Sequence, residues 1–131
     1  MKQVLQNIAN GETSLEDVPC PKPKKGYVLI ESNKSLISAG TERMLVDFGK
    51  SGWVKRARSQ PDKVKMVLDK VQTDGLITTF DAVKSKLDQP LSLGYCNVGR
   101  VIDGSDTGFE KKVRVVSNGN HAEVVRVAKN L

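Results

Sequence analysis

The feature that most constrains this chain is the spacing of its apolar residues, which changes twice along the sequence. In residues 1–41, apolar and polar residues alternate in short runs, a pattern typical of strands with one exposed face. In residues 42–89 the apolar period lengthens to about 3.6 residues, which is typical of helices. Short strand-like runs return in residues 90–131. We therefore expect a mainly β fold that is interrupted by a helical block at about residues 42–89.

Turn residues separate the expected strands. Asn10 and Gly11 lie between two alternating runs at residues 2–7 and 13–18, which predicts a hairpin. A proline-rich link then holds the chain extended as far as Gly26, where a third strand begins. The third and later strands are expected at residues 27–32, 99–102, 113–116 and 123–127.

Three helices are expected in the block. The first places Met44, Leu45 and Phe48 on one face and ends at Gly49. The second begins at Pro61 and Asp62 and ends at Gly75, and the third is capped by Thr78 or Thr79. Their apolar faces consist of Val64, Val67, Leu68 and Val71 in the second helix, and of Phe80, Val83 and Leu87 in the third.

The length of 131 residues predicts one domain, and the 5% aromatic content predicts a core built mainly from Val, Leu and Ile. Cys20 and Cys96 lie far apart and form no CxxC pair. The N-terminus has no apolar signal region, and no apolar run is long enough to cross a bilayer. These features predict a cytoplasmic location without a membrane role.

The net charge of +6 is concentrated in one segment. Residues 49–70 hold seven basic and two acidic side chains, so that 7 − 2 = +5 falls within this stretch. Such charge could bind phosphates or nucleic acid by charge and by stacking on Trp53, or it could simply form a solvated helical face. We do not favour nucleic acid, because the segment offers one aromatic residue for stacking.

Three stretches resemble one protein family. Residues 26–30 (Gly-Tyr-Val-Leu-Ile), leading to residues 39–42 (Ala-Gly-Thr-Glu), are similar to its strand followed by a Cys-Gly-Thr/Ser-Asp turn. Residues 93–101 (Leu-Gly-Tyr-Cys-Asn-Val-Gly-Arg-Val) are similar to its Leu-Gly-His-Glu-x-x-Gly-x-Val motif. Residues 119–125, with Lys-Asn-Leu at 129–131, are similar to its Gly-Gly-x-Ala-Glu-Tyr segment and following Asn-Leu. The family is the medium-chain, zinc-type alcohol dehydrogenase superfamily, whose N-terminal GroES-like domain these stretches resemble.

The resemblance implies a partly open, GroES-like β-barrel. Residues 1–131 would form a single such domain, with its β part at 1–41 and 90–131 and its helical insertion at 42–89. Within the superfamily, the sequence of these stretches is most similar to that of dehydrogenase-like proteins of bacterial polysaccharide biosynthesis that lack the zinc ligands. The family's downstream Rossmann domain, which would hold NAD or NADP in the full-length protein, is absent from this chain, and the chain has no GxGxxG motif.

The departures from the family pattern predict that this chain binds no zinc. Ala39 stands where the resemblance places the first zinc cysteine, Tyr95 replaces the ligand histidine, and Cys96 replaces the neighbouring acid. The lobe that binds structural zinc through four cysteines is replaced by the helical block. We expect no cofactor in this chain by itself.

The resemblance implies that Thr41, Tyr95 and Cys96 face the substrate cleft as candidate catalytic residues, because the family's Thr or Ser hydroxyl can join a proton relay. The alternative for all three is capping and packing alone: Thr41 could cap the following helix, and Cys96 could be a buried structural thiol. Glu42 suits the positive end of that helix. His121 is the one histidine, so acid–base chemistry near pH 7 would fall to it, but we interpret it first as a structural hydrogen-bonding residue.

The leading functional hypothesis is therefore the substrate-binding domain of an NAD(P)-dependent, alcohol-dehydrogenase-like oxidoreductase that is zinc-independent and inactive as an isolated domain. Its partners would be a small-molecule substrate, with sugar- or phosphate-bearing compounds included, and the nucleotide-binding domain. The apolar faces of the helical block must pack over the site or on another subunit, which leaves a homo-oligomer open. The alternative is a non-enzymatic binding module that presents its basic helices to an anionic partner.

Overall fold

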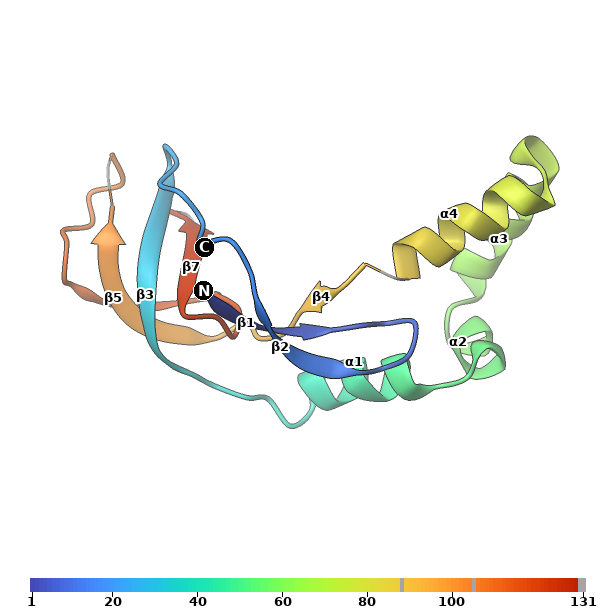
Figure 1. The fold of residues 1–131 in the computed structure, drawn as a ribbon, viewed down its shortest axis with the longest axis horizontal. Coiled ribbons are helices and arrows are strands. Elements are labelled where there is room, and N and C mark those ends of the chain that lie inside the picture. Colours follow the sequence, from blue (N-terminus) through green and yellow to red (C-terminus); the bar gives the residue numbers. More distant parts are fainter. Residues whose placement is uncertain (88, 105, 130–131) are drawn as a thin grey trace. The chain divides into compact units, whose positions relative to one another are not determined.

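The computed structural model describes residues 1–87, 89–104 and 106–129, in which the chain forms seven strands and four helices (Figure 1). The two sheets do not close into a barrel, and the architecture is that of a partial GroES-like domain with inserted helices. The expected fold class is thus confirmed. The predicted match to the family's Asn-Leu at residues 130–131 lies outside the described residues.

The chain divides into two compact units. The sheet unit consists of Met1–Leu5, Ser14–Arg43 and the residues from Ser92 on. The helical unit consists of Gln6–Thr13 and Met44–Leu91.

The core of the sheet unit is built on strand β3 (Tyr27–Ser35). This strand pairs antiparallel with β5 (Asn97–Asp103) on one side and with β7 (Val124–Ala128) on the other, and β6 (Arg114–Ser117) lies next to β5. Ile30 is opposite both Val101 and Val125, so one row across the sheet is apolar. The buried core cluster consists of Val28, Ile30, Val101 and Val125.

A second sheet contains the predicted hairpin. Strands β1 (Lys2–Gln6) and β2 (Thr13–Asp17) pair as expected, and Gly11, at a φ of +74°, turns the chain between them. The sequence did not reveal the two-residue strand β4 (Leu91–Ser92), which lies beside β1. This strand is too short to show an alternating pattern.

The helical block contains α1 (Thr41–Lys50), α2 (Trp53–Ser59), α3 (Pro61–Asp74) and α4 (Leu76–Leu87). The second predicted helix is confirmed as α3, with Pro61 in its first turn and Gly75 as its C-cap at a φ of +86°. The predicted start of the third helix is wrong, because α4 begins at Leu76. Thr79 does not cap it: its N–H bonds to Gly75 O within the helix, and its side chain is buried.

Candidate functional site

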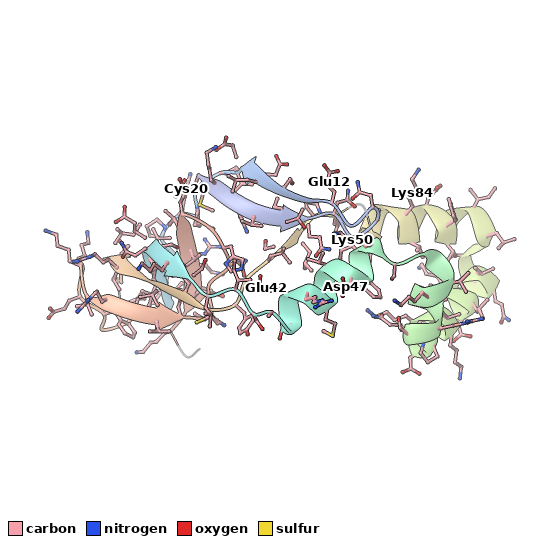
Figure 2. All side chains as sticks on the ribbon, turned by 90° about the horizontal axis from the view of Figure 1, so that it is seen from below. Glu12, Cys20, Glu42, Asp47, Lys50 and Lys84 are labelled. Carbon is pink, nitrogen blue, oxygen red and sulfur yellow. The ribbon has the colours of Figure 1, made fainter. Side chains whose placement is uncertain are left out.

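The strongest candidate site is centred on His121, whose two ring nitrogens both have partners. Nε2 lies 2.9 Å from Glu42 Oε2, and Nδ1 lies 2.7 Å from Ser35 Oγ. His121 and Glu42 are both buried, whereas Ser35 is exposed at the end of β3. The three residues form a continuous chain of polar contacts, and Figure 2 labels Glu42 at the start of α1.

Backbone contacts hold His121 in position. Its N–H donates to Leu93 O at 2.8 Å, and its carbonyl accepts from the N–H of Val4 at 2.9 Å. Gly94 lies against the ring: a Cβ at this position would be 2.6 Å from His121 N and 2.8 Å from its Cγ. Gly94 also has a φ of +94°, so both its backbone conformation and its surroundings require glycine.

The first turn of α1 positions Glu42. Its Oε1 accepts the N–H of Ser38 at 3.1 Å, and its own N–H donates to Ser38 O at 3.2 Å. The hydroxyl of Ser38 in turn accepts the N–H of Thr41 at 3.3 Å. Ser38 therefore provides the side-chain cap that we had considered for Thr41.

The surroundings of Glu42 favour its ionised form. Burial raises the pKa of this carboxyl, but the hydrogen bonds from His121 and from the Ser38 N–H, together with the charge of His121, outweigh burial and bring the pKa below its usual value. Because the carboxylate can only accept, Nε2 of His121 carries the proton of that contact. In a neutral ring Nδ1 is then the acceptor for the hydroxyl of Ser35.

Ser35 and His121 both line a shallow hollow of about 290 Å³ in the sheet unit. The polar chain therefore leads from a buried carboxylate to a surface that a small molecule can reach. The other residues lining the hollow are Lys2, Val4, Leu15, Ser32, Asn33, Lys34, Ala122 and Glu123.

A second buried polar pair lies beside this hollow. The side chain of Asn97 is fully buried and donates through Nδ2 to Ser32 Oγ at 2.7 Å. Its Oδ1 has no hydrogen-bond partner among the residues that the structure describes. Ser32 is thus held by Asn97 much as Ser35 is held by His121.

None of the three predicted catalytic candidates supplies a hydrogen bond to the side chain of His121 among the described residues. Thr41 and Tyr95 are exposed, and Cys96 is half-buried with its carbonyl accepting the N–H of Leu36 at 3.0 Å. In residues 1–87, 89–104 and 106–129, no hydrogen bond joins these three side chains. Thr41 is nevertheless the neighbour of Glu42, and Tyr95 follows the glycine that contacts His121.

Sequence reasoning weighed His121 and Glu42 separately and did not consider Ser35. The two contacts of His121 join residues 86 and 79 positions apart in the chain. The available signal was the single histidine together with a carboxylate that follows a Gly-Thr turn.

The described part of the chain contains no group of three or more His, Cys, Asp or Glu side chains placed to hold a metal ion. It also contains no helix that is long and apolar enough to cross a membrane.

The family resemblance implies a nicotinamide nucleotide, whose pyrophosphate is held by a glycine-rich turn before a helix. Three of the described helices begin directly after a glycine: α1 after Gly40, α2 after Gly52 and α4 after Gly75. None of these glycines belongs to a Gly-x-Gly-x-x-Gly pattern, so we assign no residue of this chain to the nucleotide.

Comparisons with known proteins bear on the fold. No family model matches the chain, and no curated protein matches it. Among solved structures it is similar to the quinone oxidoreductase from Coxiella burnetii, with a TM-score of 0.57 and 19% sequence identity over 98% of this chain. The chain therefore shares its fold with a part of that neighbour. This chain spans 34% of the length of that neighbour.

Proposed function

We propose that this chain is the substrate-binding domain of an NAD(P)-dependent, alcohol-dehydrogenase-like oxidoreductase, that it works without zinc, and that it is inactive by itself. The observation that carries the proposal is the polar chain from Glu42 through His121 to Ser35, which ends in the hollow. The oxidoreductase-like fold supports it.

The proposed role of this chain is to move a proton to or from the substrate. When a carbonyl oxygen gains negative charge during reduction, the hydroxyl of Ser35 gives it a proton, and protonated His121 returns a proton to Ser35 through Nδ1. Glu42 stabilises the protonated ring and fixes its orientation. During oxidation of an alcohol the proton moves the other way.

The nucleotide would be held by residues outside this chain, and we derive no step that passes through it. We propose that the substrate also contacts Thr41, Tyr95 and Cys96, because Thr41 directly precedes Glu42 and because Tyr95 and Cys96 directly follow Gly94 in the sequence. Two classes of substrate are candidates, and each is suggested by a different observation. A quinone is suggested by the structural neighbour, and a sugar- or phosphate-bearing carbonyl compound by the family resemblance.

The test uses the product of the complete reading frame that contains this chain. We expect it to oxidise NADH or NADPH when given p-benzoquinone, glyceraldehyde or a UDP-sugar. The exchange His121→Gln should lower kcat about 100-fold, since a general acid–base group contributes about 10²–10⁴-fold, with little change in KM. Ser35→Ala should lower kcat and alter the pH profile.

A matched control is Ser85→Ala on the exposed surface of α4, which should leave kcat unchanged. The proposal fails if the complete product binds neither NADH nor NADPH. It also fails if the product turns over a substrate at full rate after both the His121 and the Ser35 exchange.

A further inference from the structure

The hairpin formed by α3 and α4 leaves one apolar face uncovered. The two helices contact each other and run antiparallel, joined through Gly75 (Figure 1). On α3 the half-buried apolar residues are Val67 and Val71, and on α4 Thr79 is buried and Val83 half-buried. We take these residues to face the other helix of the hairpin.

Four further apolar residues lie to one side of that contact, whereas Met66 and Ile77 lie elsewhere on the two helices. On α3 the exposed fractions of Val64 and Leu68 are 36% and 59%, and on α4 those of Leu76 and Phe80 are 72% and 66%. Helical spacing places each pair about a sixth of a turn from its contact row, in the same rotational sense on both helices. Because the helices are antiparallel, these rotations lead to the same side of the hairpin. The result is a single exposed face that both helices share.

The charges on α3 indicate what covers this face. α3 has three lysines and three aspartates, so it is neutral, and the excess of positive charge in the preceding segment lies on Lys50 and α2. Neither a membrane surface nor a nucleic acid is therefore the natural partner of α3.

Four of these six charges have no ion-pair partner in the described part of the chain, and Lys65 and Asp69 are two of the four. Lys70 bonds Asp74 at 2.6 Å, four residues along the helix. Lys65 and Asp69 have the same spacing, yet within the described residues no such bond joins them. By helical position both lie on the outer flank of Leu68.

We propose that a second copy of this chain covers the face, with the two α3 helices antiparallel about a two-fold axis near Leu68. In such a pairing the same flanks of the two helices meet, and Lys65 of each copy faces Asp69 of the other. The α3 sequence is therefore complementary to itself in charge. The four helices form an antiparallel bundle, in which Val64, Leu68, Leu76 and Phe80 of both copies are buried.

The first experiment measures the mass of the 131-residue chain by sedimentation equilibrium. We expect a dimer at micromolar concentration and a monomer for Leu68→Asp, since the exchange would bury two carboxylates at the axis. Met66→Asp is the matched control: Met66 is 69% exposed and lies on the opposite side of α3, so this variant should stay dimeric. Far-ultraviolet circular dichroism must show that the Leu68 variant keeps its helices.

The second experiment exchanges the charges of Lys65 and Asp69, which flank the apolar face. It leaves the apolar residues of that face unchanged. Lys65→Asp or Asp69→Lys alone creates two like-charge contacts at the interface and should weaken the dimer about tenfold or more. An equimolar mixture of the two variants restores both opposite-charge contacts. It should therefore form a heterodimer as stable as the original dimer.

Three results would overturn the proposal. The first is a monomeric chain at high micromolar concentration, which would mean that another partner covers the face. The second is a dimer that persists with Leu68→Asp. The third is a mixture of the two charge variants that associates no better than either variant does by itself.

Discussion

Replacing Glu42 by glutamine should destabilise the sheet unit and change how its stability depends on pH. The carboxylate of Glu42 accepts hydrogen bonds from His121 Nε2 and Ser38 N, at 2.9 and 3.1 Å. Glutamine has nearly the same shape but only one acceptor oxygen, so one of these donors would face an NH₂ group. Removing a buried, charge-assisted hydrogen bond lowers the free energy of unfolding by about 1.5–3 kcal/mol. We expect a loss of about 2 kcal/mol at pH 6.

The sign of the pH dependence follows from the lowered pKa of Glu42. In the folded state the carboxyl holds its proton less tightly than in the unfolded chain, so ionisation stabilises the native protein. That stabilisation is complete above the ordinary pKa of glutamate and is lost as the pH falls through the lowered folded value. The difference between the wild type and Glu42→Gln should therefore shrink between about pH 5 and pH 3.

The measurement is urea unfolding at several pH values, followed by the amide NMR signals of Ile30 and Val125. These residues lie in the core of the sheet unit, so their signals report on the unfolding of that unit. Glu12→Gln on the exposed hairpin turn is the control for removing one negative charge. A loss for Glu42→Gln that is the same at pH 6 and pH 3, or that is below about 0.5 kcal/mol at pH 6, would refute the reasoning.

Three further predictions follow from single features of the chain. Gly94→Ala should lower stability by about 2 kcal/mol or more, because alanine at a φ of +94° is strained and its Cβ would meet His121; chemical denaturation measures the loss. Elemental analysis should find no stoichiometric zinc, because Ala39 and Tyr95 replace two ligands, and one zinc per chain would contradict the proposed alignment with the family. Binding of heparin through the basic residues of α2 should be weak and should disappear at high salt, so salt-resistant binding would favour the alternative of an anionic partner.

The fold could be predicted well because local patterns determine it. The change in apolar period located the helical block, and Pro61 and Gly75 marked the ends of α3. Two errors have physical reasons. Thr79 resembles a cap by residue type, but it is buried inside α4, and propensity does not distinguish these environments. The pattern also did not predict α2, because a helix of seven residues is too short to show a repeated apolar face.

The site could be predicted less well, because it depends on contacts between segments distant in sequence. The resemblance led to Thr41 and Tyr95, which directly adjoin Glu42 and Gly94. It did not lead to Ser35, which reaches His121 only because β3 extends beyond the predicted end at residue 32 to Ser35. The register of a strand end is set by its neighbours in the sheet, and no local pattern contains that information.

The burial of His121 and Glu42 in the sheet unit needs an explanation. The apolar core cluster of this unit consists of four buried residues, and His121 and Glu42 are buried polar side chains that do not belong to it. Buried ion pairs are weak sources of stability, because removing two groups from water offsets most of their attraction. Ser38 and Gly94 orient the buried His121–Glu42 pair, and Ser35 connects it to the surface. The proposed proton transfer would need a pair that is both buried and connected in this way, whereas a purely structural pair would not need the connection through Ser35.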